Sequence, residues 1–378
     1  MGASSLKTGV DSYRPTWAEI DLKLLEQNIL KLKSYLVSSG TRIMAVVKAD
    51  AYGHGAVRLT RYLEGLGVAW FGVSSVEEAV GLRKAGCRGN ILILGSLFPF
   101  RESFEAALGH DLIPTISSLE AARQLLGTVK PDARKIRVHL KMETGMQRIG
   151  VRPETCAQIA ALLKESDAVA IDGVYTHFSS AKDEEYTRRQ LQEFNRGLSL
   201  LGQKGVRPAC VHAANSAAAV RWPQAHFNMI RCGLALYGET PEFEPILSVK
   251  TRVVFVKKVP AGTPVSYERT FTTPRESVLA TLPIGYADGL PISASGRARV
   301  LINGHAAPVA GAITMDMTVV DVTDVAGVGV GSEAVVIGTG GDQRIEPGDW
   351  ADWGRMSVYE LLCRFGAPRL AKVYLEAD

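Results

Sequence analysis

Short apolar runs alternate with longer amphipathic stretches from Thr16 to about residue 240. The runs are continuous rather than alternating, which predicts strands covered by helices on both faces. The amphipathic stretch 182–201 places its leucines and Phe194 on one stripe, as a surface helix does. At least seven such strand–helix units, without G-x-G-x-x-G after the first strand, favour a (β/α)8 barrel over an open doubly wound sheet. The apolar runs include 42–47, 69–73, 90–94, 112–116, 135–140 and 171–175.

The pattern changes near residue 240, where strand-like segments follow one another with few helical stretches between them. Asn303-Gly304 between two of them predicts a type I′ hairpin turn. We therefore expect an N-terminal tail (1–13), an α/β barrel domain (14–243) and a mostly-β C-terminal domain (244–378) that ends in a mixed segment. The predicted strands are 248–257, 278–282, 298–302, 318–322 and 334–337.

Composition narrows the class of protein. Of 378 residues, 46% are apolar and 22% charged, which is enough apolar material for a packed core. The net charge of +4, spread over this length, gives no reason to expect nucleic acid. No apolar run is long enough for a membrane span, and no secretory signal is visible. The five cysteines never form C-x-x-C, which disfavours disulfides and zinc and predicts a reducing cytoplasm.

Lys48 is the strongest candidate for a catalytic residue in the sequence, because it follows three apolar strand residues directly and precedes the turn residues Tyr52 and His54. On a barrel, active sites lie where strands end and loops begin. A charged lysine is costly to bury, so the position suits an ion pair or an amine of lowered pKa that forms a Schiff base. A lysine that simply emerges at a strand end is the alternative.

Other polar residues fall at similar points. Arg148 lies in a turn after the strand 135–140 and could hold a carboxylate through its planar fork, or be a surface cation. His177 follows another strand, where it is either functional or a satisfied structural residue. Asn215 or Ser216 could cap the helix that follows, and such helix starts attract phosphate. Arg231 lies inside an apolar strand and needs a specific acceptor there.

Eight sequence blocks occur in this order along the chain: A-V-V-K-A-D-A-Y-G-H-G, K-M-E-T-G-M-Q-R, T-H-F, H-A-A-N-S, I-R-C-G-L-A-L-Y-G, V-S-Y-E-R, I-G-Y-A-D-G and T-M-D. Together they resemble the alanine racemase family over about residues 15 to 375. The resemblance implies a pyridoxal 5′-phosphate (PLP) barrel with a C-terminal β domain, working as a head-to-tail homodimer with shared active sites. It implies interconversion of L- and D-alanine by two bases, which supplies D-alanine for peptidoglycan.

The resemblance also assigns roles. Lys48 would attach the cofactor and act as one base, and Tyr267 would be the opposite base, supplied across the dimer interface. Two bases suit racemisation, which removes a proton from one face and returns one to the other. Arg231 would meet the pyridine nitrogen and leave it unprotonated. His177 would pack against the cofactor ring. The phosphate would be held by Tyr52, Ser216, the backbone near Gly233 and Leu234, and Tyr359, and Asn215 would be a further cofactor-binding residue.

On the substrate side, Arg148 would bind the carboxylate or orient Tyr267. Lys141 matches the lysine that many family members carbamylate to hold that arginine. Tyr286, Met315 and Asp316, the last two from the neighbouring subunit, would line the pocket.

The chain departs from the family where Ala312 and Ile292 replace arginines and Thr314 replaces a cysteine. This less charged approach leaves open a broader serine/alanine racemase.

Two other PLP barrels are weighed against this interpretation. A PLP-binding homeostasis protein would lack residues 245–378, including Tyr267. A barrel-fold decarboxylase would place an acid at the pyridine nitrogen, where this chain has Arg231. A non-enzymatic scaffold would have no need of Lys48 and Arg231 in apolar strands.

Overall fold

The computed structural model describes residues 13–130 and 134–376, which form two compact units. The first unit combines the residues up to 25, residues 52–55 and the chain from 237 onward, and the second combines 26–51 with 56–236. The predicted N-terminal tail lies outside the described residues except for Tyr13, which is exposed.

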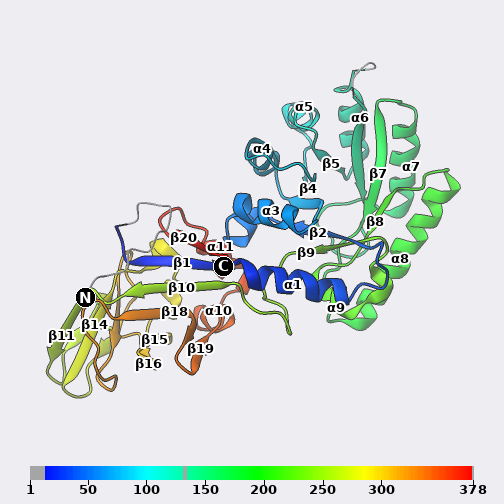
Figure 1. Ribbon diagram of the computed structural model, residues 1–378. Coiled ribbons are helices and arrows are strands. Elements are labelled where there is room, and N and C mark those ends of the chain that lie inside the picture. Colours follow the sequence, from blue (N-terminus) through cyan, green and yellow to red (C-terminus); the bar gives the residue numbers. More distant parts are fainter. Residues whose placement is uncertain (1–12, 131–133, 377–378) are drawn as a thin grey trace. The chain divides into compact units, whose positions relative to one another are not determined.

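The second unit is a parallel barrel, which confirms the predicted (β/α)8 fold (Figure 1). Its strands follow the order β8-β7-β6-β5-β4-β3-β2-β9. The N–H of Asn228 bonds the carbonyl of Val211, and that of Arg231 bonds the carbonyl of Ala214, so the edge strands approach each other. The strands are β2 (Arg42–Val46), β3 (Trp70–Val73), β4 (Asn90–Ser96), β5 (Ile113–Ile116), β6 (Ile136–Lys141), β7 (Val169–Tyr175), β8 (Cys210–His212) and β9 (Met229–Cys232).

Helices alternate with these strands (Figure 1), and the residues that they bury are mostly apolar. The predicted helix 182–201 is α8, which Asp183 caps by accepting the N–H of Tyr186. The barrel interior is filled by single side chains from successive strands, among them Met44, Trp70 and Tyr175. The helices are α1 (Leu22–Ser34), α3 (Ala56–Gly65), α4 (Val76–Lys84), α5 (Arg101–Gly109), α6 (Leu119–Leu126), α7 (Pro153–Lys164), α8 (Glu184–Gln203) and α9 (Ser216–Arg221).

The first unit is mostly β, as predicted for the C-terminal part of the chain. One sheet holds β1 (Thr16–Asp21), β10 (Leu247–Arg252), β15 (Arg299–Ile302), β16 (His305–Pro308), β18 (Glu333–Gly340), β19 (Gln343–Ile345) and β20 (Ala371–Leu375). A second sheet holds β11 (Phe255–Val259), β14 (Ser277–Leu282) and β17 (Thr318–Asp321), and a small ribbon pairs β12 (Pro264–Val265) with β13 (Phe271–Thr272). Two short helices, α10 (Pro347–Gly354) and α11 (Val358–Arg364), precede the last strand.

The structure places the beginning of the chain differently from the sequence pattern. We expected residues from 14 onward to belong to the barrel, but β1 pairs with β10 and β20 in the first unit. Glu19 forms an ion pair of 2.8 Å with Lys250, and the hydroxyls of Thr16 and Thr251 lie 2.8 Å apart. Apolar periodicity predicts a strand but not its partner, because the partners are more than two hundred residues away.

The predicted strand 248–257 is two strands, β10 and β11, in different sheets. The N–H of Val253 bonds the carbonyl of Ser332, whereas that of Val254 bonds the carbonyl of Thr281, so the chain crosses between sheets at this point. The hairpin at Asn303-Gly304 is confirmed: both residues have positive φ, 50° and 80°, as a type I′ turn requires.

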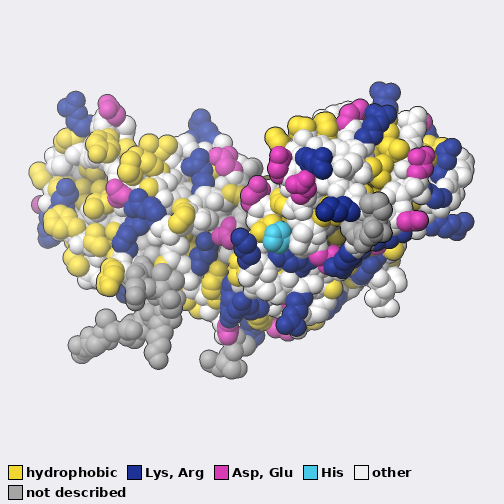
Figure 2. Space-filling model, turned by 90° about the horizontal axis from the view of Figure 1, so that it is seen from above, with side chains coloured by type: hydrophobic (Ala, Val, Ile, Leu, Met, Phe, Trp, Pro, Cys, Tyr) yellow, Lys and Arg dark blue, Asp and Glu magenta, His cyan; other side chains and the backbone are white. Residues whose placement is uncertain are grey.

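Basic and acidic side chains are interspersed on the face that Figure 2 shows, so no large patch of one charge forms there. Hydrophobic side chains gather on the part of that face where β11 and β14 lie. Within the described ranges, no helix combines the length and apolar character needed to cross a membrane.

Candidate active site

Lys48 lies just beyond the carboxyl end of β2, where barrel enzymes place their chemistry. It starts the short segment α2 (Lys48–Tyr52), in which residues 49–52 all have φ near +50°. Such left-handed backbone costs about 1–2 kcal/mol per non-glycine residue and persists only where the surroundings hold it. Two carboxylates do so: Glu78 accepts the N–H of Ala49, and Asp50 accepts the N–H of Ala56, both at 2.7 Å.

Arg231 on β9 is a buried cation that contacts no carboxylate within the described part of the chain. One terminal nitrogen donates to Nδ1 and the carbonyl of His212, each at 3.0 Å. The other donates to the carbonyls of Thr176 and Ala213 and, at 3.3 Å, to Nδ1 of His177. Among the described residues, nothing accepts from its Nε–H. Burial lowers the pKa of Arg231 to about 10, so it stays charged at neutral pH.

Lys141 ends β6, is 4% exposed, and has its Nζ 5.2 Å from the centre of the Tyr175 ring. Burial lowers the pKa of its amine to about 7, and the positive charges of Arg231, Arg148 and Lys48 add to this effect. The same cations and burial hold the pKa of His177 well below its usual range, so its imidazole is neutral. The structure therefore groups the predicted residues Lys48, Lys141, Arg148, His177 and Arg231.

Asn215 and Ser216, at the start of α9, accept hydrogen bonds from different segments. The side chain of Asn215 accepts the N–H of Ala218 and caps the helix. The hydroxyl of Ser216 instead accepts the N–H groups of Gly233 and Ala235, at 3.1 and 3.2 Å. This brings Ser216 together with Gly233 and Leu234, the predicted phosphate contacts after β9.

Three tyrosines meet in the first unit. The ring of Tyr52 lies edge-on to Tyr237, with 5.3 Å between centroids, and to Tyr359, at 5.8 Å. Tyr52 is buried, whereas Tyr359 is 48% exposed. Tyr52 and Tyr359, both predicted phosphate contacts, are therefore neighbours, and Tyr359 keeps its outer part accessible.

A second group of predicted residues lies on exposed loops of the first unit. Tyr267 is 71% exposed, and its turn is tied to the loop 312–316 because Ser266 donates to the carbonyl of Ala312 at 2.7 Å. Tyr286 joins the same loop through its N–H, which bonds the carbonyl of Thr314. A Cβ on Gly285 would lie 2.2 Å from that carbonyl, so only glycine permits this approach.

Asp316 of this group is held by Arg369 at 2.7 Å. Arg369 and Arg14 also contact the fully buried Asp288, which thereby anchors the loops that carry Tyr286 and Asp316. Met315 beside Asp316 is 51% exposed.

Several residues that shape the site have no role among the predictions made from the sequence. Glu78 holds the turn after Lys48, His212 contacts Arg231, and Asp288 anchors the loops of the first unit. His212 and Asp288 both lie in blocks that match the family, and His212 is also a polar side chain at the end of a short apolar strand.

Comparison with known proteins gives one consistent family. Residues 20–241 match the model for the alanine racemase N-terminal domain, and residues 246–374 match that for the C-terminal domain. The alanine racemase of Symbiobacterium thermophilum is 42% identical over 364 residues, 94% of this chain and 96% of that protein. The alanine racemase of Halothermothrix orenii is 39% identical, covering 93% and 94%.

Solved structures agree. The alanine racemase of E. faecalis has a TM-score of 0.91 at 32% identity, covering 97% of this chain and all of that one. That of D-cycloserine-producing Streptomyces lavendulae has a TM-score of 0.89 at 34% identity, covering 97% and 99%. Near-complete coverage in both directions and matches in both domains lead to one conclusion: this chain belongs to the alanine racemase family.

Proposed function

We propose that this chain interconverts L-alanine and D-alanine with PLP as its cofactor, in the cytoplasm, and thereby supplies D-alanine for peptidoglycan. Family membership supports the activity. The observation that supports the activity in this protein is that Lys48, at the end of β2, and the buried Arg231 belong to one site. The Nε–H of Arg231 has no protein acceptor among the described residues, so it is available to a ligand.

The residues fit PLP. A pyridine nitrogen is a neutral acceptor of the kind that the Nε–H of Arg231 lacks. The Lys48 amine suits the aldehyde, and Tyr52, Tyr359, Ser216 and the backbone at Gly233 and Leu234 would hold the phosphate beside the helix start that Asn215 caps. When bound, PLP withdraws electrons from the α-carbon of the amino acid and makes its hydrogen acidic. A guanidinium with a pKa of about 10 keeps its own proton, which favours a mild electron sink and limits side reactions.

Two residues would move the α-proton. The Lys48 Nζ exchanges it on one face and the Tyr267 Oη on the other. Tyr267 is 71% exposed and lies with Tyr286 and Met315 on the loops of the first unit, which suits residues that complete the site of a second copy. We therefore propose a homodimer with shared sites, and the exposed hydrophobic side chains around β11 fit such an interface.

Lys141 would be carbamylated. Its neutral amine adds CO2 and releases a proton, which turns a buried neutral group into an anion. The resulting carbamate would face Arg148 and Arg231 and hold Arg148 toward the substrate carboxylate. The surroundings support this because the cations that disfavour a charged lysine stabilise a carbamate.

Alanine is the proposed main substrate, and serine the second. Tyr286, Met315 and Tyr359 keep the family's inner wall, and such a wall discriminates a methylene by about 1–3 kcal/mol. Ile292 and Ala312 replace two arginines of the approach, so charge attracts the substrate carboxylate less. A decarboxylase is disfavoured by Arg231, since it would need an acid in that place.

The test uses purified protein with added PLP and pure L-alanine, D-alanine or L-serine, followed by chiral chromatography. Both alanine reactions should end at equal amounts of the two enantiomers, because enantiomers have equal free energy, and serine should react more slowly. Lys48→Ala should abolish activity, whereas Lys135→Ala, at the exposed amino end of β6, should not. Absence of alanine conversion, or a preference for serine by kcat/KM, would overturn the proposal.

A further inference from the structure

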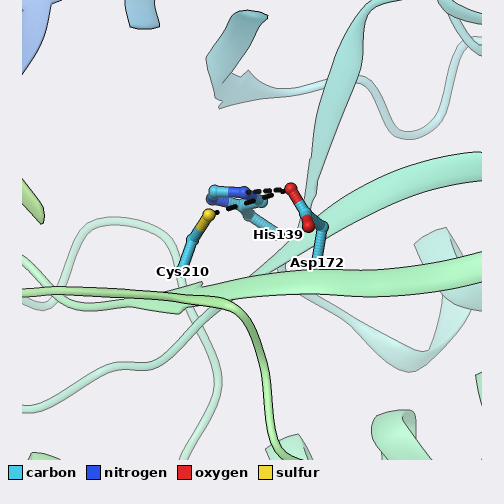
Figure 3. Close-up of side chains that lie close together, drawn as sticks. All are labelled: His139, Asp172 and Cys210. Carbon is cyan, nitrogen blue, oxygen red and sulfur yellow. Dashed lines mark hydrogen bonds and ion pairs between the residues drawn. The ribbon is translucent and has the colours of Figure 1, made fainter. Parts of the chain in front are cut away.

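A chain of polar side chains leads from Arg231 through the buried His212 and His139 to Asp172, whose side chain is 20% exposed. Arg231 on β9 donates to Nδ1 of His212 on β8, at 3.0 Å. Nε2 of His212 lies 2.9 Å from Nδ1 of His139 on β6. Nε2 of His139 lies 3.6 Å from a carboxylate oxygen of Asp172 on β7, and Figure 3 shows that end of the chain together with Cys210.

The direction of this chain follows from Arg231. A guanidinium only donates hydrogen bonds, so Nδ1 of His212 must accept. Burial lowers the pKa of both histidines, and each neutral ring then carries one proton. The proton of His212 is therefore on Nε2, which donates to Nδ1 of His139. His139 in turn carries its proton on Nε2, which lies at ion-pair rather than hydrogen-bond distance from Asp172.

A metal ion at His139, Asp172 and Cys210 is the competing interpretation, because their ligand atoms lie within 4.8 Å of one another. A metal would take the lone pair of His139 Nε2 and move that proton to Nδ1. His212 would then carry its proton on Nδ1, facing the N–H of Arg231, and two opposed donors in a dry interior are strongly unfavourable.

Both imidazoles are fixed in place by their neighbours. A Cβ on Gly173 would lie only 2.4–2.5 Å from three atoms of the His139 ring, so the glycine makes room for the imidazole. His212 stacks on Tyr175 with 4.8 Å between centroids and 4° between planes. The rings are therefore built into the barrel in the orientation that the chain requires.

We propose that Asp172 and His139 are positioning residues for Arg231. The Asp172 carboxylate stabilises the Nε2–H form of His139, which keeps Nδ1 of His212 an acceptor and holds the guanidinium plane. The orientation of the Arg231 Nε–H toward the pyridine nitrogen then depends on an acid three contacts away. The kinetic consequence rests on the proposed function, whereas the arrangement of protons does not.

The first measurement is the tautomer of each ring, by long-range ¹H–¹⁵N spectra of the full-length protein labelled with ¹⁵N-histidine. His139→Asn and His212→Asn proteins assign the two rings. We expect the proton on Nε2 in both. A proton on Nδ1 of either ring would overturn the proposal. So would a shift of His139 Nε2 on adding one equivalent of Zn²⁺ that Cys210→Ala abolishes, because it would reveal a metal site.

The second measurement is kinetic and compares Asp172→Ala, Asp172→Asn and Cys210→Ala. Asp172→Ala should lower kcat about three- to tenfold without changing KM for alanine, because Arg148 is not in the chain. Asp172→Asn retains an acceptor oxygen and should recover most of the rate, and Cys210→Ala should match the wild type. An unchanged kcat in Asp172→Ala, or an equal loss in Cys210→Ala, would refute the positioning role. An inactive wild-type protein would instead refute the proposed function. The tautomer measurement alone would then decide whether the proton arrangement from Arg231 to Asp172 is correct.

Discussion

Replacing Lys141 with methionine tests the proposed carbamate, because methionine fills similar space and cannot react with CO2. The pKa of the Lys141 amine falls from 10.5 to about 7. At pH 7 the uncharged, reactive fraction thus rises from about one in 3,000 to about one half. A hydrogen bond to a charged group contributes about 1.5–3 kcal/mol, so loss of the carbamate's hold on Arg148 should raise KM for alanine at least about tenfold.

The assay has two parts. Wild-type protein equilibrated with ¹³C-bicarbonate should give a protein-bound carbamate signal in ¹³C spectra that Lys141→Met lacks and that Lys135→Met retains. The signal should grow as pH rises through about 7, since only the neutral amine reacts. The lowered pKa of Lys141 also affects stability. The fold is destabilised below pH 7, where the buried amine must be protonated, and this effect disappears as pH rises from about 7 to 10.5. No carbamate signal, together with an unchanged KM in Lys141→Met, would refute this reasoning.

Three further predictions concern other residues. Mixing Lys48→Ala with Tyr267→Phe subunits should restore part of the racemase activity, because one of the two mixed-dimer sites would be intact; shared sites are refuted if verified mixed dimers stay inactive. The double substitution Ile292→Arg and Ala312→Arg should lower KM for alanine more than it changes kcat, because the added charges attract the substrate carboxylate before the reaction. Steady-state assays in varied salt test this. Glu239→Gln should raise the free energy of unfolding by about 1–3 kcal/mol at pH 8 and leave it unchanged at pH 4. Burial raises the pKa of Glu239 from 4.5 to about 8, so the wild-type fold loses stability as pH rises from 4.5 to 8. Calorimetry at pH 4 and pH 8 checks this.

The barrel could be predicted because its signals are local. Each strand is a continuous apolar run, and each helix such as α8 carries its own stripe and cap. The position of Lys48 was likewise readable from the three apolar residues before it. The left-handed turn after Lys48 was not, because four non-glycine residues of ordinary type adopt it only under the hold of Glu78 and Asp50.

Long-range partners account for what the sequence could not predict. β1 lies in the first unit because of pairings with β10 and β20, which no local pattern encodes. His139 and His212 are 73 residues apart and meet only because β6 and β8 belong to one barrel. Arg231 could be recognised as needing an acceptor, but the identity of its acceptors, carbonyls and imidazoles rather than an acid, required the fold.

The most direct test of the two-base account is the exchange of the α-hydrogen of alanine in D2O by Tyr267→Phe protein supplied with PLP. Lys48 remains on one face of the substrate, so this variant should exchange the α-hydrogen of a single enantiomer with retention of configuration and should hardly racemise it. Proton NMR follows the exchange, and chiral chromatography follows the configuration. Racemisation by Tyr267→Phe at the wild-type rate, or equal exchange from both enantiomers, would contradict the account.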